Sequence, residues 1–156
     1  MRHDDLDEVF CSVAQTWSVI GERWTMLLIR DAFLGVRRYE DFRKRLGVSR
    51  NLLSDRLALL LDEGVLARRV YCEHPERYEY RLTEKGMALY PILLALGAWG
   101  DAYKLLEPPI TYTHQLCGQE CHPQLTCDRC GEPIQARDVE ASLAPHAFER
   151  VPEKVC

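Results

Sequence analysis

Residues 49–63 constrain the fold of this chain more than any other stretch. Leu53, Leu57 and Leu60 recur at the spacing of one helical face, so the stretch is predicted to be an amphipathic helix that buries its leucines. Ser49 is a suitable N-cap because its hydroxyl can accept a hydrogen bond from an unpaired backbone N–H. An ordinary surface helix has the same pattern, so the role of this helix depends on its neighbours.

The segment before this helix predicts a second, shorter helix from Tyr39 to Leu46, followed by a tight turn at Gly47 and Val48. Two short helices joined by a glycine-containing turn form a helix-turn-helix, and the second helix of such a pair enters the major groove of DNA. Arg and Asn side chains read guanine and adenine edges there. The predicted DNA contacts from the second helix are Ser49, Arg50, Asn51, Ser54 and Arg56, and the alternative for Arg56 is a structural ion pair.

After Gly64, a suitable residue for the end of a helix, the apolar period changes from 3.6 to 2. Two strands are predicted, Val65–Tyr71 and Arg77–Leu82, joined by a loop at residues 73–76. A basic hairpin directly after a helix-turn-helix is a wing, whose arginines are attracted to the minor groove. The arginines expected to contact the DNA backbone or minor groove, with a solvated basic surface as the alternative for some, are Arg37, Arg38, Arg68, Arg69 and Arg77.

Three further helices are predicted around this unit. Residues 12–21 form the first, and residues 23–34 form a second that is apolar on most sides and therefore buried. A long helix from residue 83 to about residue 106 is expected to kink at Pro91, which lacks an N–H. Its apolar residues cover nearly the whole circumference, and one small domain can cover only one side. The other side is expected to meet a second copy in a two-fold homodimer.

The distribution of charge favours a local contact with nucleic acid. The chain of 156 residues has a net charge of −4, which argues against general affinity for DNA. Residues 36–82, however, carry eleven basic and eight acidic residues, a net charge of +3, while the segments on both sides are acidic. Basic charge is thus concentrated around the proposed groove helix, as a localised phosphate contact requires.

The ends and apolar stretches of the chain predict a cytoplasmic protein without membrane contact. The N-terminal ten residues are acidic and lack the pattern of a signal peptide. The longest nearly apolar stretch, Met87–Gly100, is too short to cross a bilayer.

Four runs of residues resemble the HxlR family of winged helix-turn-helix transcription regulators, which are MarR-like: CSVAQTWSVIGERWTMLLIRD, RRYEDFRKRLGVSRNLLSDRLALLLDEGVLARRVY, PERYEYRLTEKG and WGD. The resemblance implies a homodimer on a palindromic operator near a promoter, with a recognition helix at 49–63 and a wing at 65–82. Ser12 and Glu22 depart from the family pattern, which often has Pro and Gly there, but neither lies in the part that reads DNA.

The resemblance also implies a signal that controls DNA binding, from an unidentified small molecule or electrophile. In HxlR-type sensors a cysteine at the place of Cys11 can respond to electrophiles or oxidants. A helix N-terminus can lower the pKa of such a thiol. The alternative is that Cys11 is a small residue buried under the dimer interface.

Cysteine and histidine residues after Pro108 and Pro109 indicate a separate metal-binding tail. The predicted domains are therefore residues 1–107 and 108–156. Two half-sites, His114-x2-Cys117-Gly118 and Cys127-x2-Cys130-Gly131, are typical of turns that bend the backbone around zinc, which prefers four nitrogen or sulfur ligands in a tetrahedron. The predicted ligands are His114, Cys117, Cys127 and Cys130, with Cys121 or His122 as competitors for His114. The alternative is a hairpin with reduced, metal-free thiols.

The predicted fold class is mainly α with a small β-hairpin wing, an α+β winged helix-turn-helix with a short C-terminal β-hairpin and zinc-knuckle extension. The predicted function is sequence-specific transcriptional regulation. A small zinc enzyme and a zinc-ribbon interaction module are the alternatives. A catalytic zinc keeps an open coordination position, whereas these four ligands form a closed set, so no enzymatic activity is expected.

Overall fold

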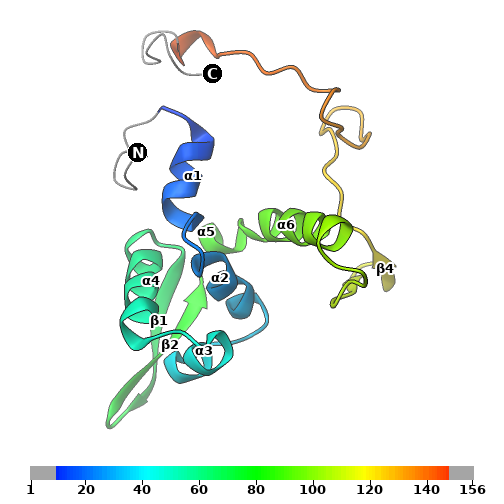
Figure 1. Cartoon of the computed structure of the whole chain (residues 1–156). Helices are drawn as coiled ribbons and strands as arrows, with labels where there is room; N and C mark the ends of the chain where they lie inside the picture. Colours follow the sequence, from blue (N-terminus) through cyan, green and yellow to red (C-terminus); the bar gives the residue numbers. More distant parts are fainter. Residues whose placement is uncertain (1–9, 148–156) are drawn as a thin grey trace. The chain divides into compact units, whose positions relative to one another are not determined.

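The computed structural model describes residues 10–147. Contacts divide the chain into two compact units, with the division between Tyr90 and Pro91. The elements, in chain order, are α1 (Ser12–Ile20), α2 (Thr25–Phe33), α3 (Tyr39–Leu46), α4 (Arg50–Asp62), β1 (Leu66–Glu73), β2 (Glu76–Leu82), α5 (Glu84–Met87), α6 (Tyr90–Tyr103), β3 (Tyr112–His114), β4 (Gln119–Cys121) and the 3₁₀ turn η2 (Pro145–Ala147) (Figure 1). These units are not the predicted domains, and the predicted domain boundary after residue 107 stays a prediction.

The first unit has a single core into which α2, α3, α4 and the β1–β2 hairpin each contribute side chains. Ile29, Phe42 and Leu60 have no exposed surface. The leucines predicted to face inward, Leu53, Leu57 and Leu60, are all buried, which confirms the amphipathic reading of this helix. The Phe42 ring meets the Tyr80 ring of β2 edge-on, with 6.4 Å between centroids. This contact joins the helix-turn-helix to the wing.

The wing is a two-stranded antiparallel sheet. Leu66 pairs with Leu82 at its base and Glu73 with Glu76 at its tip, with an irregularity between Val70 and Cys72. The two predicted strands are confirmed, and the loop between them is shorter than expected. The alternation also holds at the base, where Tyr80 is buried between the exposed Arg81 and the half-buried Glu79.

The prediction of one long helix over residues 83–106 is wrong. The chain forms the short α5, a turn at Ala88 and Leu89, and then α6, which ends at Tyr103. Pro91 occupies the second position of α6, where its missing N–H costs nothing. Continuing α5 into α6 would instead drive the proline ring into the carbonyl of residue 87, so the helix ends before the proline rather than kinking at it.

The second unit contains very little buried surface. No residue from 91 to 145 is buried, and α6 has none among its fourteen residues. After α6 come the β3–β4 hairpin and a second turn closed by a single bridge between Thr126 and Pro133. None of the described helices is long and apolar enough to cross a membrane.

Candidate nucleic-acid interface

The turn between α3 and α4 has the backbone geometry that its sequence requires. Gly47 ends α3 with a φ of 65°, in the left-handed region that glycine adopts without strain, and its N–H donates to the Arg43 carbonyl. Ser49 then caps α4, because its Oγ accepts a hydrogen bond from the Leu52 N–H at 3.3 Å. The helix thus begins at a defined residue, and its first turn is fixed relative to α3 (Figure 1).

Most of the predicted base-reading residues lie on the solvent-exposed face of α4. Arg50, Asn51 and Ser54 are exposed, whereas Leu53, Leu57 and Leu60 are buried. Arg56 is different: its side chain is only 22% exposed, and one guanidinium nitrogen lies 3.7 Å from the Glu22 carboxylate. The structure therefore favours the ion-pair alternative for Arg56.

Tyr39 is a residue of this surface that the sequence reasoning missed. Its hydroxyl donates to the Arg50 carbonyl at 2.9 Å and lies 3.1 Å from the Ser54 Oγ. It therefore ties the start of α3 to the first two turns of α4. The Tyr39 ring packs against the core. Only the position of α4 shows that the hydroxyl reaches the groove helix.

An acidic residue accompanies the basic side chains at the start of α4. Glu40 accepts a hydrogen bond from the Arg43 Nε at 2.9 Å and lies 4.0 Å from an Arg50 guanidinium nitrogen. The hydrogen bond from Arg43, followed by the charges of Arg43, Arg50 and Lys44, lowers the pKa of Glu40. Glu40 is therefore ionised at neutral pH and holds Arg50 loosely, since Arg50 remains 72% exposed.

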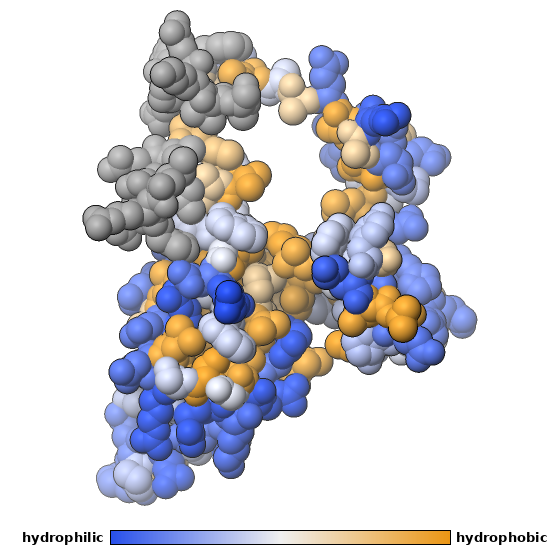
Figure 2. All heavy atoms as spheres, viewed as in Figure 1, coloured by the Kyte–Doolittle hydropathy of each residue, from blue (hydrophilic) through white to orange (hydrophobic). Residues whose placement is uncertain are grey.

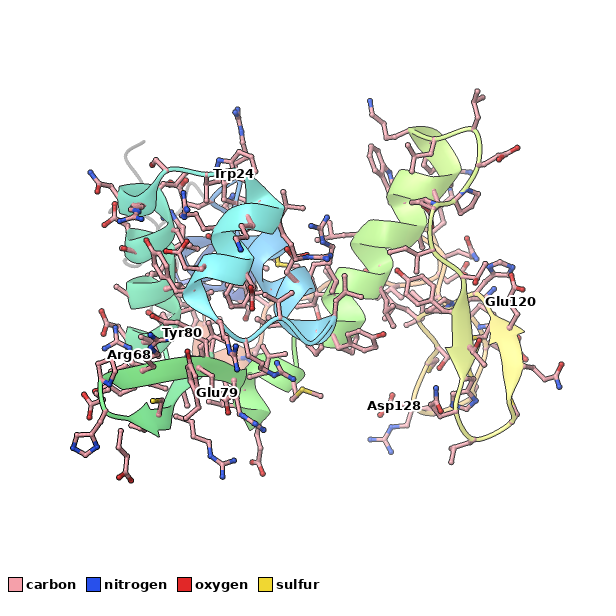
Figure 3. All side chains as sticks on the ribbon, turned by 90° about the horizontal axis from the view of Figure 1, so that it is seen from below. Trp24, Arg68, Glu79, Tyr80, Glu120 and Asp128 are labelled. Carbon is pink, nitrogen blue, oxygen red and sulfur yellow. The ribbon has the colours of Figure 1, made fainter. Side chains whose placement is uncertain are left out.

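Aromatic rings of the wing lie beside two of the arginines predicted to contact DNA, Arg38 before α3 and Arg68 on β1. Arg38 lies over the Tyr71 ring, 4.6 Å from its centroid. Arg68 lies within 6 Å of the centroids of both Tyr78 and Tyr80, and Figure 3 shows it on the wing with Tyr80. Arg69 and Arg77 are exposed, and hydrophilic residues cover this end of the first unit in Figure 2. Because Arg38 and Arg68 already lie against these rings, they lose less side-chain freedom when they contact a phosphate.

Arg37, predicted to contact DNA, makes hydrogen bonds within the protein. Its guanidinium donates to the Ala32 carbonyl at the end of α2, and its own carbonyl accepts from the Tyr80 N–H at 2.8 Å. The side chain is half-buried. A nearby charge cluster has the same role, since the fully buried Asp31 carboxylate accepts from Arg30 of α2 and Arg45 of α3. These contacts fix α2 against α3 and the wing.

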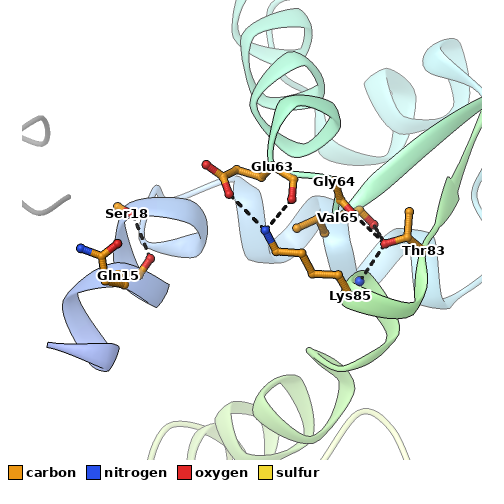
Figure 4. A network of polar contacts seen from close by, with 8 residues as sticks. Gln15, Ser18, Glu63, Gly64, Val65, Thr83 and Lys85 are labelled. Carbon is orange, nitrogen blue, oxygen red and sulfur yellow. Dashed lines mark hydrogen bonds and ion pairs between the residues drawn. The ribbon is translucent and has the colours of Figure 1, made fainter. Parts of the chain in front are cut away.

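A cavity of about 410 Å³ lies between α1 and the region where α4, β1 and α5 meet. Its apolar wall contains Ile20, Val65 and Leu89, and Gln15 and Ser18 of α1 line it as well. Lys85 lines the cavity too, and its ammonium contacts the Glu63 carbonyl at 2.5 Å and the Glu63 carboxylate at 3.2 Å (Figure 4). Thr83 joins the same network through the carbonyls of residues 64 and 65.

The first of the two predicted zinc half-sites is the turn of the β3–β4 hairpin. The His114 Nδ1 lies 3.4 Å from the Cys117 Sγ. The Gly118 N–H donates to the His114 carbonyl at 2.8 Å, with Gly118 at a φ of 67°. Cys121 is half-buried at the far end of the hairpin, opposite Tyr112.

The second half-site has the same construction. The Gly131 N–H donates to the Cys127 carbonyl at 2.8 Å, with Gly131 at a φ of 77°. Hydrogen bonds from the backbone N–H groups of Arg129 and Cys130, and then from the Cys130 side chain, lower the pKa of Cys127. Within the part of the chain that is described, no three potential ligands come together. Each pair is formed, and the predicted four-ligand site stays a prediction.

Cys11, the candidate redox residue, occupies the N-cap position of α1 with an extended backbone and makes no side-chain cap. Its thiol is free and half-buried. This position agrees with the expected place at a helix start.

Comparison with known proteins identifies the family. The model of the HxlR-like helix-turn-helix family matches residues 19–107. The HTH-type transcriptional regulator Rv3095 of Mycobacterium tuberculosis is 43% identical over 136 residues, which is 86% of each chain. The HTH-type regulator YdeP of Bacillus subtilis is 36% identical and covers 60% of this chain and 74% of its own.

Solved structures agree with the sequence relatives. The crystal structure of PA1607, a candidate transcription factor, has a TM-score of 0.75 at 38% identity and covers 86% of this chain and 95% of its own. The reduced form of the redox regulator HypR has a TM-score of 0.56 at 33% identity and covers 59% of this chain and 92% of its own. Together with the capped groove helix and the wing, these matches show that the chain belongs to the HxlR-like helix-turn-helix family of transcriptional regulators.

Proposed function

We propose that the chain acts as a homodimer that binds a palindromic operator, with one α4 helix in each half-site and the wings on the flanking backbone. The observation that carries this proposal is the exposed face of α4, where Arg50, Asn51 and Ser54 stand on a helix capped by Ser49. Arginine reads guanine and asparagine reads adenine with paired hydrogen bonds in the major groove. The stacked Arg38 and Arg68 supply positive charge for phosphate.

The contact at Tyr39 suggests what Ser54 reads. Because the Tyr39 proton is donated to the Arg50 carbonyl, the 3.1 Å contact to Ser54 is made with the serine proton. The Ser54 oxygen then has only lone pairs left to offer. In the major groove it can accept from the exocyclic amines of adenine or cytosine. Arg50, in contrast, can only donate, so the two residues favour different bases.

The experiment is binding of the full chain to operator and scrambled duplexes over a range of salt concentrations. Asn51→Ala should cost about 1–3 kcal/mol and relax the preference at one base pair. Gln124→Ala, which removes an exposed amide in the second unit, is the matched control and should change nothing. If Asn51→Ala weakened the affinity for every duplex equally, Asn51 would contact only phosphate. Absence of salt-dependent DNA binding by the native chain would refute the proposal.

Exposed apolar residues on two helices support the dimer. In α1, Val13 is 74% and Trp17 is 52% exposed, and in α6, Leu96 is 47% and Trp99 is 59% exposed. Figure 2 shows apolar residues on the surface of both helices. Aromatic and aliphatic side chains of this size are rarely left in water over whole helix faces.

Sedimentation at micromolar concentration should give about twice the 18.1 kDa chain mass. Leu96→Glu should yield monomers, and a native chain that sediments as a monomer would refute this part.

A signal that controls binding has two candidate sites in the first unit. The solved relative HypR is described as a redox regulator, and Cys11 offers a half-buried thiol at the start of α1. The cavity beside α1 has a volume suitable for a small organic molecule. Treatment with an oxidant should release operator DNA from the native chain and not from Cys11→Ser. Release from both proteins would exclude Cys11 and assign the response to another of the free thiols. Release from neither would exclude thiol oxidation as the signal and leave the cavity as the candidate site.

A further inference from the structure

The tail after α6 has ordered turns but no core that could hold them. Not one residue between 104 and 145 is buried. Leu116 is 91% exposed within the first turn, and Leu125 and Ile134, which flank the second turn, are 64% and 42% exposed. A segment this short that buries so little apolar surface needs another source of stability, such as a bound metal.

The two turns repeat one design in detail. In each, a ligand residue is followed three positions later by a cysteine and four positions later by a glycine whose N–H bonds back to the first carbonyl at 2.8 Å. Both glycines have a positive φ, 67° at Gly118 and 77° at Gly131. This backbone directs both side chains of a pair to the same side of the turn, as the 3.4 Å between His114 Nδ1 and Cys117 Sγ illustrates. Each turn thus presents half of a tetrahedral site.

We propose that one zinc ion joins the two turns, with His114, Cys117, Cys127 and Cys130 as its four ligands, and that metal binding closes the tail around it. Three thiolates and one imidazole form a standard closed structural zinc set. Magnesium and calcium require oxygen ligands, and an iron–sulfur cluster of the common type requires four cysteines. Of these metals, zinc is the one that fits this ligand set.

The segment that connects the two turns is long enough for both turns of one protomer to bind the same zinc ion. Cys121, at the end of β4, pairs with Tyr112, two residues before His114 on β3, which corresponds to about 7 Å along a strand. Six residue steps separate Cys121 from Cys127, and an extended chain of that length spans about 20 Å. The second turn can therefore return to the first. Closure would also bring Leu116, Leu125 and Ile134 out of water.

The hairpin register decides between the competing ligands. Cys121 and His122 lie at the far end of the hairpin from the turn, since Cys121 is paired with Tyr112 while His114 is paired with Gln119. Cys121 also lines a cavity of about 480 Å³ against α6, together with Ala98 and Ala102. His114 shares a turn with Cys117, whereas neither competitor does.

The first test is metal content of the full chain, purified without a metal-binding tag and dialysed after exposure to zinc. We expect about one zinc per chain. Cys117→Ser and Cys127→Ser should each lose it, while Cys121→Ser and the control Cys72→Ser, in the wing, should keep it. Zinc near zero in the native chain would overturn the proposal. Half a zinc per chain, retention in Cys127→Ser or loss in Cys121→Ser would overturn the ligand assignment.

The second test does not depend on variants that could fail to fold. Cobalt added to the chelator-treated native chain should produce the strong visible absorption of a tetrahedral cobalt thiolate site, and zinc should abolish it. Hydrogen exchange should accelerate across residues 112–134 after chelation and slow again with zinc, while the core around Phe42 and Leu57 stays protected. The spectrum of an octahedral cobalt site would refute the closure. Hydrogen-exchange rates in the tail that do not change when metal is removed or added would refute it as well. Neither readout involves DNA.

Discussion

The hydroxyl of Tyr39 allows a sharp test of how the groove helix is held. Tyr39→Phe removes one oxygen and leaves the ring in the core. The change deletes the 2.9 Å bond to the Arg50 carbonyl and the 3.1 Å contact to Ser54. Among the described residues, no other contact of this side chain depends on the hydroxyl, so the substitution isolates the connection between α3 and α4.

The expected magnitude follows from these two bonds. A hydrogen bond within a protein contributes about 0.5–1.5 kcal/mol net, and both of these are near solvent, so we expect a loss of about 1–2 kcal/mol in the free energy of unfolding. For a unit of this size, each kcal/mol lowers the melting temperature by about 4–8 °C. The Arg50 carbonyl can turn to water after the change, so a larger loss is not expected.

The assay is thermal and urea unfolding of both proteins at one fixed concentration, followed by operator binding. Tyr78→Phe is the matched control, because its hydroxyl contacts only Glu76 on the exposed wing. The Tyr39 variant should also discriminate less well at the base pair read by Ser54, since the serine proton becomes free to rotate. Unchanged stability together with unchanged discrimination would refute the idea that Tyr39 positions α4.

Three further perturbations test separate parts of the first unit. Ser49→Ala removes the cap on α4 and should cost about 1 kcal/mol of stability, while Ser49→Gly should cost only a few tenths; equal losses in thermal unfolding would exclude capping. Leu57→Ala opens a cavity in the core and should cost about 2–5 kcal/mol in urea unfolding, and a loss below that range would mean that the core is loosely packed there. Arg77→Ala should weaken operator binding and lower the slope of log K against log salt by about one unit, whereas Arg129→Ala in the tail should not; an unchanged slope for Arg77→Ala would exclude a wing contact.

Local patterns in the sequence were sufficient for the helix-turn-helix and the wing. The spacing of Leu53, Leu57 and Leu60, the serine before them and the glycines at 47 and 64 each act within one turn of helix. Strand alternation likewise depends on the nearest neighbours. Such features follow from short-range geometry, so they can be read without knowing what packs against what.

The sequence could not decide outcomes that depend on contacts between distant segments. Arg37 and Arg56 had the same basic character as the other candidates, yet the structure turns Arg37 toward the Ala32 carbonyl and Arg56 toward Glu22. The break before Pro91 was expected as a kink, because the sequence shows that a proline disturbs a helix but not on which side the chain resumes.

For this protein, the sequence by itself determined the order of the helices and strands up to residue 82, the buried face of α4 and the residue types available to read DNA. The tertiary structure alone decided which polar groups remain free for that purpose. Burial of a charge is unfavourable without a partner, so each basic side chain near the core is drawn to whatever acceptor folding brings close. Arg37 and Arg56 acquired their partners in this way, and Arg50, Asn51 and Ser54 kept their exposed positions.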